Sequence, residues 1–102
     1  MTETQNNPGI NLVNSFLSQG MKVVIHDGLD ESSIHSNIQT VQEVFDDCSM
    51  VNISALDEES DTVYGSFRLQ KDVKTQKMEI VDWVMNAFSQ NEFNKAYGIK
   101  PN

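Results

Sequence analysis

Apolar residues recur along the chain in short blocks, and the spacing inside each block predicts a helix or a strand. The first block follows Asn7 and Pro8, a favourable helix start, and Gly20 stands where that helix would end. Its apolar positions recur as one buried helical face requires: Ile10, Leu12, Val13, Phe16 and Leu17. We expect a helix that packs on the core, the alternative being an amphipathic helix that binds a partner.

The second block, Met21–His26, predicts a strand. Val23, Val24 and Ile25 follow one another and are β-branched, and Asp27-Gly28 is typical of a turn. Consecutive apolar residues, unlike alternating ones, indicate that both faces of a strand are covered. We therefore expect a central strand.

The clearest helical periodicity comes next. Asp30, Ser32 or Ser33 can cap this helix, and its acidic end carries Asp46 and Asp47. Its apolar positions mostly lie three or four residues apart: Ile34, Ile38, Val41, Val44 and Phe45.

Two alternating segments then predict an antiparallel hairpin. Apolar and polar residues alternate over residues 51–55 and again over residues 63–69, as in half-buried strands. The charged connection Asp57–Asp61 is short enough to form the tip of the hairpin.

A final helix is predicted from Thr75, which would cap it. The apolar positions Val81, Val84, Met85 and Phe88 are spaced for one buried face. The stretch Ser89–Glu92 has the form of a capping box, so the helix would break there and restart, with Gly98 as its end.

These elements predict an α+β domain with a small, mostly antiparallel sheet of about three strands and three to four helices. The inner order of elements resembles a ferredoxin-like βαββαβ unit without its last strand. We place a single domain over residues 9–98, with flexible tails over residues 1–8 and 99–102.

Charge is distributed unevenly along this domain. The net charge is −8, and between Asp27 and Asp61 there are ten Asp or Glu residues and no Lys or Arg. If the helix end and the hairpin tip approach one another, their carboxylates form one negative face suited to a basic partner. The predicted partner-binding residues are Glu43, Asp46, Asp47, Asp57, Glu58, Glu59 and Asp61.

Residue types that carry chemistry are few. His26, His35 and Cys48 are the candidates for a general base, a metal ligand or a nucleophile, but no third ligand follows at a recognisable spacing. The acids of the loop lack the pattern of a calcium-binding EF-hand. We expect no catalytic residue, no metal and no cofactor, hence a protein that is not an enzyme.

The basic residues Arg68, Lys71, Lys74 and Lys77 form either a small phosphate-contacting strip or a solvated connector that balances the acids. The acidic surface as a whole would be repelled by nucleic acid and by anionic membranes. One cysteine and the lack of a signal-like or membrane-spanning apolar run lead us to expect a cytoplasmic protein.

The expected function is therefore that of a small acidic binding protein that inhibits or masks a basic, nucleic-acid-binding enzyme or toxin. Immunity proteins, antitoxins and phage-encoded inhibitors of defence systems work in this manner. The alternative is a homo-oligomeric regulatory or assembly domain, a homodimer in the simplest case, that uses its sheet edge or C-terminal helix. Its anchors would be aromatic: Trp83, Phe88, Phe93 and Tyr97.

Overall fold

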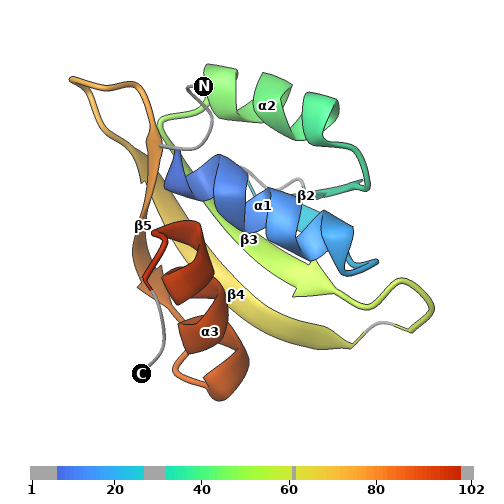
Figure 1. Cartoon of the computed structure of the whole chain (residues 1–102). Coiled ribbons are helices and arrows are strands. Elements are labelled where there is room, and N and C mark those ends of the chain that lie inside the picture. The colour runs from blue at the N-terminus through green and yellow to red at the C-terminus, as the bar shows by residue number, and fades with distance from the viewer. Residues whose placement is uncertain (1–6, 27–31, 61, 100–102) are drawn as a thin grey trace.

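The computed structural model describes residues 7–26, 32–60 and 62–99. Within these residues, three helices lie on one face of a five-stranded antiparallel sheet with strand order β2-β1-β3-β4-β5 (Figure 1). The α+β class is confirmed, but the predicted count of about three strands is wrong. In chain order the elements are α1 (Pro8–Ser18), β1 (Lys22–His26), β2 (Ser32–His35), α2 (Ile38–Asp47), β3 (Met50–Leu56), β4 (Val63–Lys71), β5 (Met78–Trp83) and α3 (Ala87–Ala96).

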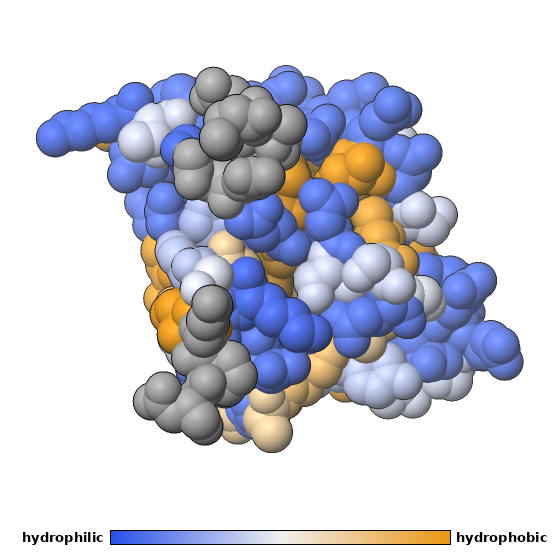
Figure 2. All heavy atoms as spheres, viewed as in Figure 1, coloured by the Kyte–Doolittle hydropathy of each residue, from blue (hydrophilic) through white to orange (hydrophobic). Residues whose placement is uncertain are grey.

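The core lies between the helices and the face of the sheet that they cover. Helix α1 contacts both other helices as well as β1 and β5, so it occupies the middle of the helical layer. In Figure 2, which shows the helical side, hydrophilic residues cover most of the surface and apolar residues show between the helices and at the left margin. The largest fully buried apolar side chains are Phe16, Phe67, Leu12, Ile25, Ile53, Leu69 and Met78.

Strand β1 lies inside the sheet, paired with β2 on one side and β3 on the other. The prediction that both of its faces are covered is wrong. Val23 and Ile25 are buried under the helices, whereas Val24 points to the opposite face and is half-buried. No helix of the described residues lies on that opposite face, so this part of the chain forms two layers.

The predicted β3–β4 hairpin is confirmed. Val51 pairs with Leu69 and Ile53 with Phe67, and all four side chains are buried. Near the tip, Ala55 pairs with Gly65 but Leu56 pairs with Val63, so one extra residue forms a β-bulge.

The predicted helix start before Ile34 is wrong. Ser32–His35 form the edge strand β2, and α2 begins only at Ile38, where the Asn37 side chain accepts a hydrogen bond from Gln39 N at 2.7 Å. The side chain of Ile34 is 63% exposed, so its four-residue spacing from Ile38 does not reflect a shared helical face. The third candidate cap, Asp30, lies outside the described residues.

The helix predicted from Thr75 is also wrong in its first half, because Met78–Trp83 form strand β5. Leu69 pairs with Ile80 but Arg68 pairs with Asp82, which leaves Val81 as the extra residue of a bulge. The bulge breaks the two-residue alternation that identifies a strand.

Helix α3 begins at Ala87, after Asn86, whose side chain accepts a hydrogen bond from Ser89 N at 2.7 Å. The predicted capping box at Ser89–Glu92 is therefore wrong, and both of its end residues are buried inside the helix. The predicted helix ends are confirmed at Gly20 and Gly98, which have φ angles of 81° and 70°.

The resemblance to a ferredoxin-like unit does not hold for the whole chain, because two strands were missed and the order is α-β-β-α-β-β-β-α. At the N-terminus, Asn7 caps α1 and Pro8 opens it, so the last two residues of the expected tail belong to this helix. The other expected tail residues, except Ile99, lie outside the described part of the chain. Of the described helices, none combines the length and the apolar character that crossing a membrane requires.

Candidate functional site

The acidic end of α2 carries three of the predicted partner-binding residues. Glu43, Asp46 and Asp47 are exposed on this helix. A cation lies beside them, because Lys71 Nζ donates a hydrogen bond to the backbone oxygen of Asp46 at 3.2 Å. This end of the molecule is thus of mixed charge.

The β3–β4 loop carries the second group, and its order depends on one carboxylate. Asp57 Oδ2 accepts hydrogen bonds from Glu59 N at 3.0 Å and Ser60 N at 2.9 Å, and Asp57 Oδ1 accepts one from the Tyr64 hydroxyl at 2.8 Å. The Tyr64 hydroxyl, followed by these backbone N–H groups, lowers the pKa of Asp57 to about 2. Glu58 and Glu59 are exposed. Asp61 lies outside the described residues.

The two acidic groups are not brought together. Helix α2 ends just before Met50 and the loop begins just after Leu56, so the groups lie at opposite ends of β3. Seven residues of strand, the length of β3, separate two points by about 23 Å. The structure therefore offers two separate acidic areas instead of one negative face.

The four basic residues do not share one face either. Arg68 points away from the helices on β4, and Lys71 reaches back to the end of α2. Lys74 lies in the β4–β5 turn, which Asp72 holds by accepting a hydrogen bond from Lys74 N at 2.7 Å. The arrangement fits a connector and not a continuous phosphate-binding strip.

The residues considered for catalysis lie apart. His26 lies on the uncovered face, as Val24 does two residues before it, whereas His35 pairs with the buried Val23 and so faces the helices. His35 Nδ1 shares a hydrogen bond with Thr40 Oγ1 at 2.9 Å, and partial burial lowers the pKa of His35. Cys48 ends α2 and packs against the core. In the described ranges, no three His, Cys, Asp or Glu side chains are grouped so that they could hold a metal ion.

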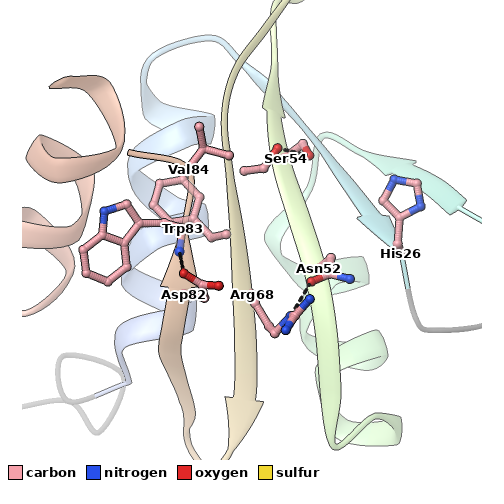
Figure 3. Close-up of a pocket in the computed structure, with 9 residues that line it drawn as sticks. His26, Asn52, Ser54, Arg68, Asp82, Trp83 and Val84 are labelled. Carbon is pink, nitrogen blue, oxygen red and sulfur yellow. Dashed lines mark hydrogen bonds between the residues drawn. The ribbon is translucent and has the colours of Figure 1, made fainter. Parts of the chain in front are cut away.

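A row of polar side chains crosses the uncovered face of the sheet, and sequence reasoning missed it. His26 pairs with Asn52, Asn52 with Arg68, and Arg68 with Asp82, so the row spans β1, β3, β4 and β5 (Figure 3). Arg68 Nε donates to Asn52 Oδ1 at 3.3 Å, and Asp82 Oδ1 accepts from Trp83 N at 2.9 Å. The polar positions that alternate along β3 and β4 predicted two members of this row, Asn52 and Arg68.

A shallow hollow of about 400 Å³ opens beside this row. Two serines, Ser54 and Ser66, lie in its floor with their hydroxyl oxygens 2.9 Å apart. Small side chains in the centre and larger ones around them make the hollow. Its lining offers hydrogen-bond donors and acceptors, with no grouping of side chains that resembles a nucleophile and its base.

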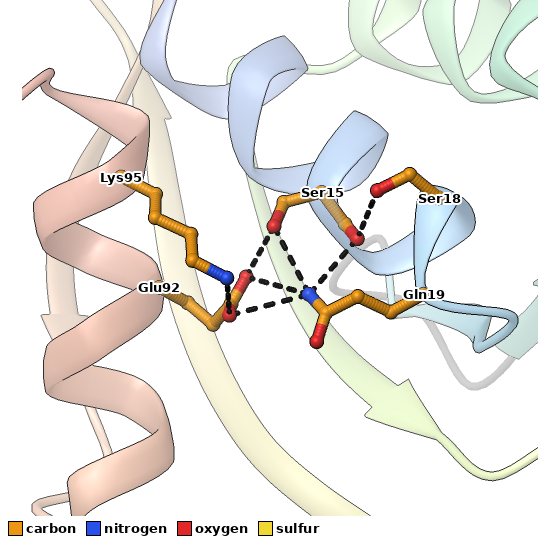
Figure 4. Close-up of polar contacts among 5 residues, drawn as sticks. All are labelled: Ser15, Ser18, Gln19, Glu92 and Lys95. Atoms are coloured by element: carbon orange, nitrogen blue, oxygen red, sulfur yellow. Dashed lines mark hydrogen bonds and ion pairs between the residues drawn. The ribbon is translucent and has the colours of Figure 1, made fainter.

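A second unexpected polar cluster lies between α1 and α3, with the buried carboxylate of Glu92 at its centre (Figure 4). The Glu92 side chain is 1% exposed; its Oε1 accepts a hydrogen bond from Ser15 Oγ at 2.6 Å, and its Oε2 pairs with Lys95 Nζ at 3.1 Å. Gln19 Nε2 lies 3.3 Å from both oxygens. All of these partners come from the two helices, so the cluster joins α1 to α3.

The aromatic residues proposed as anchors for an oligomer pack inside the chain. Phe93 stacks on Trp83 with 4.5 Å between ring centroids and contacts Tyr97 at 4.7 Å. Phe88 packs on Phe16 at 5.9 Å. They hold α3 on the sheet, and this use competes with a role at an interface.

Comparisons with known proteins give no relative: no family model, no curated protein and no solved structure matches the chain.

Proposed function

We propose that this protein is a non-enzymatic binding protein whose β3–β4 loop contacts a basic surface of a partner protein. We call residues Asp57, Glu58, Glu59 and Ser60 the acidic tip. The proposal keeps one of the two acidic areas predicted from the sequence and leaves the end of α2 out, because Lys71 lies beside Asp46 there.

The order of the acidic tip is the observation that supports this proposal. Four hydrogen bonds end on the Asp57 carboxylate, three from inside the tip and one from Tyr64 on β4. The residues Asp57–Ser60 are therefore tied to one another while Glu58 and Glu59 face solvent. A preordered charged loop loses little conformational entropy on binding, which favours recognition.

The chemistry of the tip favours a partner rich in Lys and Arg. Exposed carboxylates present negative charge as phosphates do, so a surface that binds nucleic acid is a natural target. Occupying such a surface would mask it, which is the mode of action expected of an inhibitor. The net charge of the whole chain, −8, would speed the encounter by long-range attraction.

Affinity capture tests the proposal. The immobilised chain is exposed to a lysate of the organism that encodes it at low salt, and retained proteins are eluted with a salt gradient and identified. We expect a basic protein that is retained by the natural chain and lost by the double variant Glu58→Gln, Glu59→Gln.

The matched control is Glu43→Gln, Asp47→Asn, which removes the same charge from the end of α2. The proposal requires that this variant retain the basic protein as the natural chain does. Equal retention by all three chains, or equal loss from both variants, contradicts a specific role of the acidic tip.

A further inference from the structure

The uncovered face of the sheet differs in charge from the rest of the molecule. The charged side chains that the strand alternation places there include two cations, Lys22 and Arg68, and the acid Asp82, whereas Glu79 turns to the outer edge of β5, where its Oε1 accepts from the Tyr97 hydroxyl. The face is thus close to neutral in a chain of net charge −8. Two copies of such a chain repel one another, and a balanced face is where that repulsion is smallest.

One row of side chains on this face reads the same in both directions. Val24 pairs with Ser54, Ser54 pairs with Ser66, and Val84 N donates to the backbone oxygen of Ser66 at 3.0 Å. The row is therefore Val24, Ser54, Ser66, Val84, with small hydroxyls at the centre and an aliphatic side chain at each end. In a two-fold interface the same patch meets itself reversed, and this row would place valine over valine and serine over serine.

The neighbouring row is complementary to itself when reversed. It runs His26, Asn52, Arg68, Asp82 across the same four strands. Laid over a reversed copy, it places His26 against Asp82 and Asn52 against Arg68, each pair occurring twice. In this overlay no two like charges face one another. The amide oxygen of Asn52 faces the donors of Arg68, and the carboxylate of Asp82 faces His26.

We propose that two copies of the chain pack through their uncovered sheet faces, with a two-fold axis that runs along the strands between β3 and β4. This axis keeps the strands of both sheets nearly aligned, which is one of the two usual ways for sheets to pack, at about 10 Å between them. It centres the contact on Ser54 and Ser66. The hollow at these serines then gives the Arg68 side chain of each copy room to reach Asn52 of the other copy.

Exposed aliphatic side chains strengthen the case for a covered face. The exposed fractions of Ile34, Met50 and Val63 are 63%, 46% and 53%. The bulge residue Val81, 49% exposed, and Val84, 52% exposed, lie at the β5 side. All of these except Ile34, whose strand β2 has no strand of the second copy opposite it, would lose contact with water on packing, and burial of apolar surface drives association.

The size of the face predicts a weak dimer. Strands about 4.8 Å apart with a rise of about 3.3 Å per residue give the four overlapping strands β1, β3, β4 and β5 a footprint of roughly 400 Å² per copy. Stable interfaces bury about 800 Å² per partner, and those well below this value belong to weak, transient complexes. The dimer should therefore form with rising protein concentration instead of being permanent.

Sedimentation velocity of the full chain over a range from micromolar to millimolar concentration tests the proposal. We expect the natural chain to shift from monomer to dimer. His26→Glu places two carboxylates opposite one another at each contact, and Asp82→Lys replaces the carboxylate that faces His26 with an ammonium group, which accepts no hydrogen bond. Each variant should weaken the dimer by about tenfold or more. The double variant H26E/D82K places opposite charges at both contacts and should recover dimerisation.

The controls carry the same charge changes on the helical side of the molecule. Asn14→Glu matches His26→Glu, and Glu43→Lys matches Asp82→Lys; all four residues are exposed, so circular dichroism should show a folded chain throughout. A natural chain that stays monomeric at every concentration overturns the proposal. So does a dimer that neither single variant weakens, that the control variants weaken equally, or that the double variant fails to restore. The acidic tip takes no part in these variants, so this result is independent of the proposed function.

Discussion

Gly65 on β4 lies directly against the hydroxyl group of Ser89 on α3. A Cβ atom added to Gly65 would lie 2.7 Å from Ser89 Oγ and 2.9 Å from Phe88 Cδ2. Ser89 is fully buried, and within the described residues its hydroxyl has no hydrogen-bond partner. The helix can approach the sheet this closely only because the strand has no side chain there.

Gly65→Ala should therefore destabilise the protein. The added methyl group must displace Phe88 or the whole of α3, and overpacking of this kind costs about 1–3 kcal/mol. Urea denaturation followed by far-UV circular dichroism measures the change in the free energy of unfolding. A loss below about 0.5 kcal/mol would fall within the usual range for surface substitutions and would show that α3 does not pack as tightly as the structure has it.

Ser89→Ala should have the opposite effect. The substitution removes a buried hydroxyl that makes no hydrogen bond, and leaving such a group unpaired costs about 1–3 kcal/mol. We expect the free energy of unfolding to rise, measured in the same denaturation experiment. Ser18→Ala is the control, since that exposed hydroxyl donates to Ser15 O at 2.9 Å and its loss should not stabilise the chain.

Glu92→Ala should loosen the contact between α1 and α3. The variant loses charge-assisted hydrogen bonds to Ser15 and Gln19, each of the kind that contributes about 1.5–3 kcal/mol, and it leaves a cavity. We expect a loss of about 2–4 kcal/mol in the free energy of unfolding. Lys95→Ala, at a side chain that is 50% exposed, keeps the hydrogen bonds from Ser15 and Gln19 to the carboxylate and should cost less than Glu92→Ala. Equal losses in the two variants would contradict a central role for the carboxylate.

The hydrogen-bonded hydroxyl of Tyr97 leads us to expect a loss of stability at high pH. Its hydroxyl accepts from Ile80 N at 3.1 Å and donates to Glu79 Oε1 at 2.8 Å, and burial raises the pKa of Tyr97 to about 12. Because the folded state holds this proton more tightly than the unfolded state, the stabilisation is complete below pH 10 and is lost as the pH rises towards 12.

The measurement is the free energy of unfolding of the natural chain and of Tyr97→Phe across this pH range. The natural chain should be the more stable of the two at neutral pH, and the difference should shrink above pH 10. The pKa of Tyr64 is raised as well, and this residue is present in both chains, so its effect cancels. A difference that stays constant with pH would rule out the hydroxyl as the cause.

Asp57 should titrate at low pH because of Tyr64. The pKa of Asp57 is about 2 against its usual 3.8, so its hydrogen bonds are fully present above pH 4 and are lost as the pH falls towards 2. Tyr64→Phe removes the largest cause and should raise the pKa, as followed by the carboxyl carbon resonance in NMR. An unchanged titration midpoint in this variant would contradict the contact between the two side chains.

Local signals in the sequence predicted those parts of the fold that depend on neighbouring residues. The start and end of α1 follow from Asn7, Pro8 and Gly20 alone, and the β3–β4 hairpin follows from strict alternation on both sides of a polar loop. In each case local preference and tertiary contacts favour the same structure. The predictions of α1 and of the β3–β4 hairpin were correct for that reason.

The two missed strands show where local signals stop. Ile34 lies on the uncovered face of an edge strand, yet its spacing to Ile38 imitates a helix. Val81 is the extra residue of a bulge, so β5 has no regular alternation. Both errors come from pairing with distant strands, which no local pattern contains.

The candidate sites were predictable only in part, for the same reason. The order of the acidic tip involves residues close in sequence, and its composition was already visible at Asp57–Ser60. The row from His26 to Asp82 depends on the register of four strands, and the apolar spacing of one of them, β5, predicts a helix. That the two acidic groups lie apart follows from the direction of β3, which becomes evident only in the folded chain.

The hydroxyl of Tyr97 also matters for how the chain folds as it is synthesised. It satisfies Ile80 N on the outer side of β5, where an unpaired N–H would invite another strand. Since α3 follows β5 in the chain, a ribosome exposes this strand before its protecting helix is available. Released chains that end between Trp83 and Tyr97 lack this protection and should therefore aggregate more readily than chains that include Gly98, and a chaperone that binds extended segments would act on them.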